Sequence, residues 1–454
     1  MITQMEDIQP RILTRAPFPR ERKVDVFRLE PSYRALIVAC VFILDEGVFS
    51  VLLGARDFSQ GRMLSSLLII LSIPVCLSSM KKLPSLSTPR FWLPIALYAW
   101  FIIISFISNV FIFHYSSDNW VLSLYSVMPI TCVILFRSID SNYSDIVLGI
   151  IIAAFIVSAL VILDKIYPIP QFETFRRMSA FGEFGNAERL TILKDACVLA
   201  FLLVVGRLTF GKTGLAGKVL LVIALLVIGY PIAFSFESRI AFSTIVVSFA
   251  LYFIFARVGG GRKITAGLMV AIVGIPVAVA VLSRFIEAIL SAGSLSNYFE
   301  SNNVDIRFES GSYFISKFLD TSGVGIGVMT SNPAKPNILS EVVVKSYILT
   351  DHGLFASLYQ FGIVGAIIAC LMTVALIKWF IRIGRARIHP SSLDITMTGA
   401  FVFGSVMQPI PINYFTLTHT CLLGGTLWYA AFRARWEANV LKKSVAFRAR
   451  SPSF

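Results

Sequence analysis

Asp351 and His352, adjacent residues in the last third of the chain, combine a carboxylate with an imidazole. Such a pair can remove a proton from a hydroxyl group, because imidazole titrates near neutral pH and a neighbouring carboxylate can orient it or act in its place. An apolar run, GLFASLYQFGIVGAI, follows directly, and Asp351 can equally cap a helix that begins there. The two roles can coexist, and the sequence leaves open which residue is the base.

Three arginines offer a second kind of chemistry, the binding of anions. Arg177 lies in FETFRRMSAFGEFGN, Arg239 in FESRIAF and Arg307 in NNVDIRFESGSYFISKFL. A guanidinium group is a planar fork that matches two phosphate oxygens, so two forks that meet at a membrane boundary would hold a lipid-linked diphosphate. Each arginine also has a simpler reading, in which it reaches lipid headgroups or, for Arg307, pairs with Asp305 or Glu309 on a solvated face.

Glycines mark two places of close backbone approach. The segment SGVGIGV contains Gly325 and Gly327, but no strand precedes it and no GK[ST] follows it, which disfavours a phosphate-binding loop. We expect a tight turn that brings the loop backbone close to a helix or a ligand. Gly362 and Gly365 should lie on one side of the following helix, at a spacing that permits close helix approach.

The residues around Arg307 predict a helix of their own. Ile306, Tyr313, Phe314 and Phe318 recur at helical spacing, which is typical of an amphipathic helix near a membrane surface. No comparable pattern predicts a metal site, because the cysteines lie in or at the ends of apolar blocks and form no CxxC or Cys/His cluster.

The elements that must position these residues follow from composition. Of 454 residues, 56% are hydrophobic and 15% charged, whereas soluble domains are about 45–50% apolar and about 25% charged. The apolar residues fall in blocks of about twenty, the length that crosses about 30 Å of hydrocarbon. The sequence therefore predicts an all-α, polytopic membrane bundle of about twelve transmembrane helices and excludes a soluble enzyme. The predicted spans are 34–54, 64–80, 91–113, 119–137, 145–167, 189–206, 217–236, 240–257, 263–285, 353–378, 395–411 and 414–433.

The charges orient this bundle. Most Lys and Arg residues fall on one set of alternating loops and on the two tails, which predicts that both termini are cytoplasmic. This topogenic role accounts for most of the +14 net charge and disfavours nucleic-acid binding, while the tails should touch anionic membrane lipids. The expected parts are a cytoplasmic basic tail (1–33), nine spans (34–285), a long outer loop with the amphipathic helix (286–352), three spans (353–433) and a second basic tail (434–454).

Three motifs occur in an order that resembles the Wzy-type polysaccharide polymerase and O-antigen ligase superfamily. They are ESRIAF, DIRFESGSYFISKFLDTSGVGIG and TDHGLFASLYQFGIVG. The resemblance covers residues 170–380 by motif and the whole chain by topology. It implies a bacterial inner-membrane protein whose long loop is periplasmic.

The resemblance also implies roles for individual residues. Arg239 and Arg307 would hold the diphosphate, Asp351 occupies the family's acidic or histidine position, and His352 replaces the usual Asn. That departure favours a polymerase over a ligase. The implied reaction transfers an oligosaccharide from undecaprenyl diphosphate to a sugar hydroxyl, without metal or other cofactor, and builds an exopolysaccharide or O-antigen. A chain-length regulator and export proteins are the implied protein partners.

Two alternatives stay open. A ligase would use the same site to move finished glycan onto another acceptor. A lipid-linked oligosaccharide flippase or other transporter would instead place charged residues along a central pathway between related halves. The two halves of this chain differ in loop length, which weakens the transporter hypothesis.

Overall fold

The computed structural model describes residues 32–46, 59–80, 89–112, 127–172, 194–210, 214–234, 302–327, 353–386 and 421–450, with the isolated positions 48, 124, 245 and 248. Every regular element in these ranges is helical. The α-helices are α1 (Tyr33–Asp45), α3 (Ser59–Met80), α4 (Leu93–Phe106), α6 (Cys132–Ser138), α7 (Tyr143–Ile166), α9 (Lys194–Phe210), α10 (Leu215–Phe234), α14 (Asn302–Asp320), α16 (Gly353–Ala386) and α19 (Cys421–Arg450). Shorter elements are the 3-10 helices η2 (Pro89–Trp92), η4 (Met128–Thr131) and η5 (Pro170–Phe172) and the π-helix η3 (Ile107–Ile112).

Three helices in the described ranges are long and apolar enough to cross a membrane. They are Tyr143–Ile166, Leu215–Ala233 and Leu358–Arg382. The expectation of an all-helical chain with candidate membrane spans is therefore confirmed in this coarse form. The predicted spans 263–285 and 395–411, and nearly all of 240–257, lie outside the described residues.

Local capping explains where α7 begins. The side chain of Asn142 accepts a hydrogen bond from the backbone N–H of Asp145 (2.8 Å), and the Asp145 carboxylate accepts one from the N–H of Asn142 (3.0 Å). This reciprocal capping box satisfies N–H groups that a helix start leaves without partners. The same carboxylate accepts a bond from Ser32 Oγ (2.6 Å), the residue that caps α1. The first turns of α1 and α7 are thus tied together.

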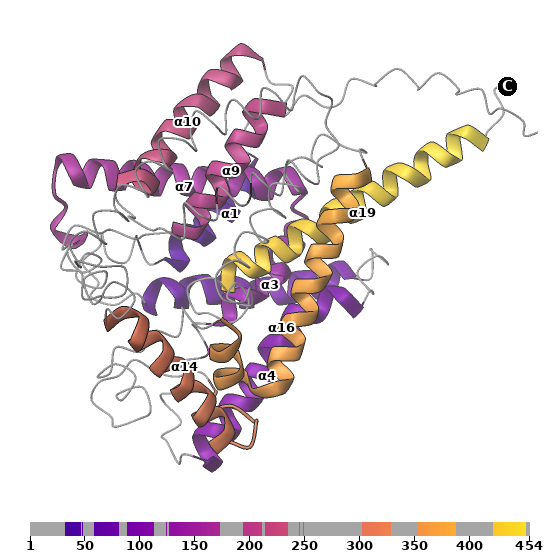
Figure 1. The fold of residues 1–454 in the computed structure, drawn as a ribbon. Coiled ribbons are helices and arrows are strands. Elements are labelled where there is room, and N and C mark those ends of the chain that lie inside the picture. The colour runs from indigo at the N-terminus through magenta and orange to yellow at the C-terminus, as the bar shows by residue number, and fades with distance from the viewer. Residues whose placement is uncertain are drawn as a thin grey trace, which may run out of the picture.

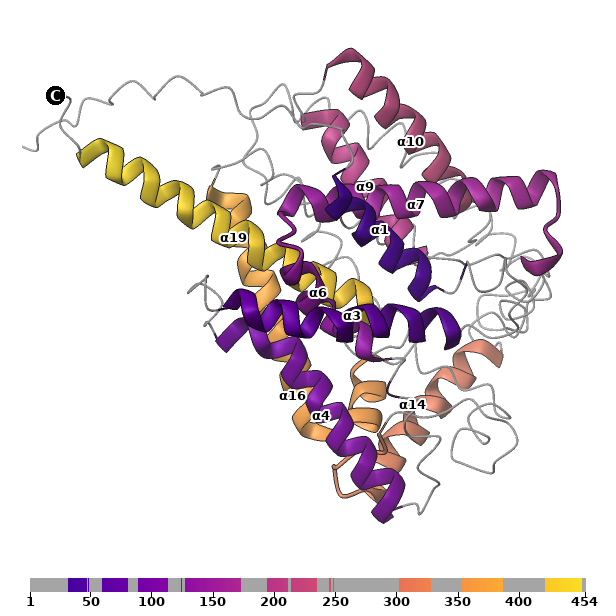
Figure 2. The same ribbon diagram turned by 180° about the vertical axis from the view of Figure 1, so that it is seen from behind.

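The helices gather in two groups with a layer between them. Helices α1, α7, α9 and α10 pack against one another, while α4, α14 and α16 form a second group (Figure 1). Helices α3, α6 and α19 lie between the two (Figure 2). Aromatic rings join α16 to α19, where the ring centroids of Trp379 and Trp428 lie 4.7 Å apart. The last turns of α19 extend away from the rest of the described chain, into the segment predicted as the C-terminal tail.

Candidate functional site

The predicted site residues divide into those that the structure describes and those that it does not. Arg177, Arg239, Asp351 and His352 lie outside the described residues. Arg307 lies in α14 and is described only by its place in that helix. The structure describes all four predicted glycines. Gly325 and Gly327 lie in the turn after α14, Gly362 and Gly365 lie in α16, and the two segments are in contact.

Helix α14 packs on α16 through one face. Ser310 and Phe314 are buried, and the Phe314 ring lies 4.9 Å from the ring of Tyr359. Residues three, four and seven apart share a face of an α-helix. The face of α14 that carries Ser310 and Phe314 is therefore the face turned toward α16.

A tight turn follows α14. Ser322, Gly323, Gly325 and Gly327 all have positive φ angles, between 54° and 88°. Thr321 steadies the turn, because its hydroxyl accepts a hydrogen bond from the N–H of Gly325 (3.1 Å). The turn that the SGVGIGV segment predicts is present, and what it approaches is α16.

Gly362 breaks α16. Its backbone angles, φ 65° and ψ −173°, fall in a region that is essentially open to glycine alone. The next residue, Ile363, donates its N–H to the carbonyl of Gly323 (3.1 Å) instead of to its own helix. The expectation that Gly362 and Gly365 share one side of a continuous helix is therefore wrong at Gly362, although Gly365 does lie in the helical part that follows.

The loop after α14 replaces the hydrogen bonds that the break removes. The N–H groups of Ile326 and Gly327 donate to the carbonyls of Tyr359 and Gln360, at 2.8 and 2.9 Å. A continuous α-helix would satisfy these carbonyls from its own next turn. Buried backbone groups almost always find partners, and here the partners come from a separate segment.

We call the segments Ser322–Gly327 and Tyr359–Ile363 together the glycine joint. Their backbones are so close that side chains cannot fit between them. A Cβ atom on Gly325 would lie 3.0 Å from the Gly362 Cα, and one on Gly362 would overlap the carbonyl of Val324. The joint therefore depends on glycine at both contact points.

Helix α4 and η3 contact both halves of the glycine joint. Trp100 Nε1 donates to the carbonyl of Phe361 (2.9 Å), and the buried Ser108 Oγ donates to the carbonyl of Gly325 (2.6 Å). The absence of a side chain on Gly365 lets the Trp100 ring approach. Sequence analysis missed both donors, because a bond to a backbone carbonyl requires no particular partner side chain.

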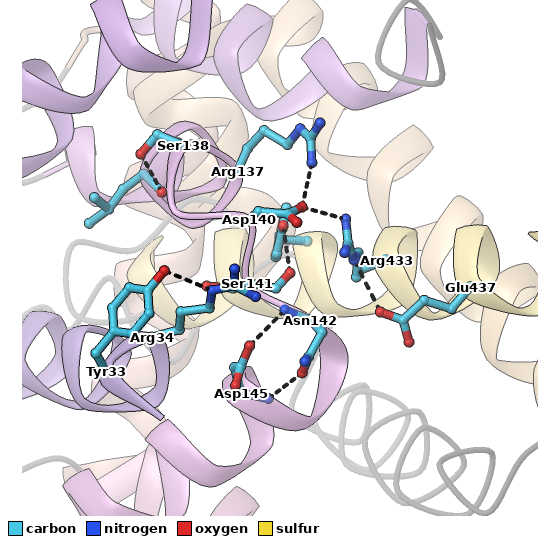
Figure 3. Close-up of polar contacts among 12 residues, drawn as sticks. Tyr33, Arg34, Arg137, Ser138, Asp140, Ser141, Asn142, Asp145, Arg433 and Glu437 are labelled. Carbon is cyan, nitrogen blue, oxygen red and sulfur yellow. Dashed lines mark hydrogen bonds and ion pairs between the residues drawn. The ribbon is translucent and has the colours of Figure 1, made fainter. Parts of the chain in front are cut away.

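A second polar cluster joins two other segments, residues 137–140 and residues 433–437, as Figure 3 shows. The Asp140 carboxylate accepts hydrogen bonds from Arg137 Nη1 (2.9 Å) and Arg433 Nη1 (3.0 Å). Arg433 Nε also donates to Glu437 (3.0 Å). We call Arg137, Asp140, Arg433 and Glu437 the ionic joint, which links the turn between α6 and α7 to α19.

The ionic joint is better suited to hold helices than to bind a ligand. Its two arginines and two acids balance in charge, so the four side chains together present no net charge to an anion. Tyr429 Oη donates a further hydrogen bond from α19 to the carbonyl of Ser141 (2.9 Å), the residue that follows Asp140. Arg137 is 4% exposed, and its Nε and Nη2 have no hydrogen-bond partner among the described residues.

Within the described ranges, no group of three His, Cys, Asp or Glu residues is placed to hold a metal ion. No protein-family model matches the sequence, and a comparison with curated proteins finds no significant match. The arguments about function below therefore rest on the residues, their chemistry and the geometry of the two joints.

Proposed function

We propose that this chain is a membrane-embedded polysaccharide polymerase. It joins undecaprenyl-diphosphate-linked oligosaccharide repeat units on the periplasmic side of a bacterial inner membrane. In this proposal the chain crosses the membrane about twelve times, both termini are cytoplasmic, and residues 286–352 form a periplasmic loop.

The exposed surface of α16 supports the membrane setting. An apolar stripe runs along this helix, with each of its side chains 45–57% exposed. The stripe consists of Ile363, Val364, Ile367, Leu371 and Val374. A contiguous apolar surface of this kind is unfavourable in water and favourable against lipid tails.

The contacts between helix ends support the alternating topology. Ser32 bonds to Asp145, and both residues belong to ends that the proposal assigns to the cytoplasmic side. Ser108 bonds to Gly325, and both belong to ends assigned to the periplasmic side. An error of one span in either assignment would put these partners on opposite sides of the bilayer.

The observation that carries the enzymatic part of the proposal is the glycine joint. It fixes α14, the helix of Arg307, against α16, which begins one residue after His352 in the sequence. A transfer reaction requires that the group holding the donor and the group activating the acceptor keep a set geometry. The joint links the two stretches of chain that carry these groups in the proposal.

In the proposed reaction, Asp351 or His352 takes the proton from a sugar hydroxyl of the acceptor. The hydroxyl oxygen attacks the anomeric carbon of the donor, and the bond from that carbon to the diphosphate oxygen breaks. Undecaprenyl diphosphate leaves with the bonding electrons. Arg239 and Arg307, with Arg177 as a third candidate, stabilise the negative charge that develops on it.

The test is the glycan made by the parent bacterium with and without the gene. Loss of a polymerase leaves single repeat units in place of long chains. Purified protein in lipid vesicles should also convert undecaprenyl-diphosphate-linked repeat units into longer chains with no added metal or nucleotide sugar.

Other outcomes of the same test contradict the proposal. Long chains that accumulate without their final acceptor indicate a ligase, and single units trapped on the inner leaflet indicate a flippase. An unchanged glycan together with no elongation in vesicles rejects all three functions.

A further inference from the structure

The α4–η3 segment makes one side-chain hydrogen bond to each half of the glycine joint. Trp100 lies 261 residues from its partner Phe361, and Ser108 lies 217 residues from its partner Gly325. Phe361 belongs to α16, whereas Gly325 belongs to the turn that follows α14. One helical segment from early in the chain therefore braces two elements from late in the chain.

The helical geometry changes at this contact. Helix α4 ends at Phe106, and π-helical geometry runs from Ile107 to Ile112. Ser108, one of the two donors, lies inside this π-helix. Insertions of π-helix are rare and are found frequently at functional sites. Their occurrence beside the glycine joint is an observation independent of the hydrogen bonds.

Close packing accompanies the bonds. Ser105 and Ser108 are both completely buried, and a Cβ atom on Gly327 would lie 2.6 Å from the Ser105 Cα. The turn after α14 thus rests directly on the backbone at the end of α4. A movement of this turn away from its present place would therefore disturb its contacts with the α4–η3 segment.

We infer that Trp100 and Ser108 are positioning residues for the glycan transfer proposed above. Each fixes one half of the glycine joint, and together they set how α14, the helix of Arg307, lies against α16. This inference rests on the proposed function and adds to it a helix that none of the predicted site residues occupies.

The physical reason is that the backbone bonds of the joint connect only the turn and α16, whereas the two donors tie both segments to α4 as well. Three backbone hydrogen bonds connect the turn to α16, and short backbone ladders of this kind can bend. Side-chain donors from a third direction restrict that bending. Displacement of a reacting group by about 1 Å can lower turnover about 10²-fold.

The test measures the distance between α14 and α16 directly. Spin labels on Ser316→Cys of α14 and Leu371→Cys of α16, both exposed positions, report it by pulsed electron paramagnetic resonance. The exposed Cys40 and Cys370 are first replaced by alanine. In full-length protein in lipid vesicles, Trp100→Phe and Ser108→Ala should each broaden the distance distribution.

Two matched controls isolate the donors. Trp92→Phe makes the same change eight residues earlier, at a half-buried ring that packs on Phe91. Ser78→Ala removes a hydroxyl that donates to a backbone carbonyl within its own helix (2.8 Å). Both controls should keep the wild-type distribution. Each test variant removes one donor and leaves the backbone hydrogen bonds intact. If Trp100→Phe does not fold, Ser108→Ala still tests the inference.

Activity separates this inference from the function on which it rests. If the wild-type protein elongates glycan, each test variant should lower turnover about tenfold to a hundredfold. The KM for the lipid-linked donor should stay within about twofold of the wild-type value, since neither residue touches the donor in this proposal. The positioning role is overturned if the distance distribution between α14 and α16 is unchanged in the variants. It is also overturned if that distribution broadens while turnover stays the same. A wild-type protein that never elongates glycan refutes the proposed function instead, and broadened distances would still support the brace.

Discussion

The two joints hold their helices by opposite means. The ionic joint uses four charged side chains, and half of the Asp140 side chain is exposed. The glycine joint uses backbone N–H and carbonyl groups, with neutral donors from Trp100 and Ser108. The buried charge of Arg137 is tolerated because it pairs with a carboxylate that water reaches, whereas backbone groups removed from water must be paired with one another.

The difference also predicts how each joint fails. A joint made of backbone contacts depends on the absence of side chains, so any added atom is damaging. A joint made of ion pairs loses one interaction at a time and is screened by salt. Substitutions in each joint test this contrast, and two others on α14 compare it with the proposed chemistry and with a surface ion pair; they are given from the largest expected effect to the smallest.

Gly362→Ala should destabilise the protein most. The new methyl group would overlap the Val324 carbonyl, in a backbone region that other residues avoid. We expect the free energy of unfolding in detergent to fall by about 3 kcal/mol or more. Gly214→Ala is the control, because a Cβ there meets nothing within 4 Å. Equal stability of the two variants would refute the close approach in the glycine joint.

Arg307→Ala should have the largest effect on chemistry. If this guanidinium stabilises the departing diphosphate, turnover should fall about 10²-fold, with Arg239→Ala causing a similar loss. Lys317→Gln on the same helix removes an equal charge that pairs with Asp320 at the surface (3.5 Å). Turnover of this control should match wild type. Normal chain length and yield in both arginine variants would remove them from the site.

Asp140→Ala should weaken the ionic joint and also add a backbone cost, because Asp140 has a positive φ of 50°, which Asp tolerates better than Ala. The substitution removes the acceptor that Arg137 and Arg433 share, and we expect the free energy of unfolding to fall by about 2 kcal/mol. Raising salt to about 1 M should reduce the deficit only in part, because Arg137 and Arg433 are 4% and 13% exposed and buried pairs are screened much less than exposed ones. The deficit of Gly362→Ala should not depend on salt. A salt-independent loss at Asp140 would mean that the turn conformation matters more than the charges.

Asp320→Ala should change the stability of the protein least. It breaks the exposed Lys317–Asp320 pair at the end of α14, and surface pairs of this kind contribute about 0–1 kcal/mol. A thermal shift within error of wild type is expected. A clear loss would mean that the end of α14 is held by charge as well as by the glycine joint.

Sequence periodicity located the helix of the candidate site well. The spacing of Tyr313, Phe314 and Phe318 predicts a helix, and α14 covers all three. The GxGxG pattern after it predicts a tight turn, because closely spaced glycines permit the positive φ angles that such a turn needs. Both features are local, so a short stretch of sequence is enough to specify them.

The partners of these elements could not be predicted in the same way. Glycine at position 362 permits a helix break but does not require one, since glycine three residues before another is also typical of close helix packing. The bonds from Trp100 and Ser108 end on backbone carbonyls, which every residue has. Asp140 and Arg433 lie 293 residues apart, and their pairing depends on how α6, α7 and α19 pack.

The length of α19 has a mechanical consequence. The helix is clamped at Arg433 by the ionic joint and continues to Arg450, which at 1.5 Å per residue is an arm of about 25 Å. A helix transmits force along its axis with little bending. A sideways force on the tip of this arm therefore acts as a torque on the salt bridge between Arg433 and Asp140, next to the junction of α6 and α7.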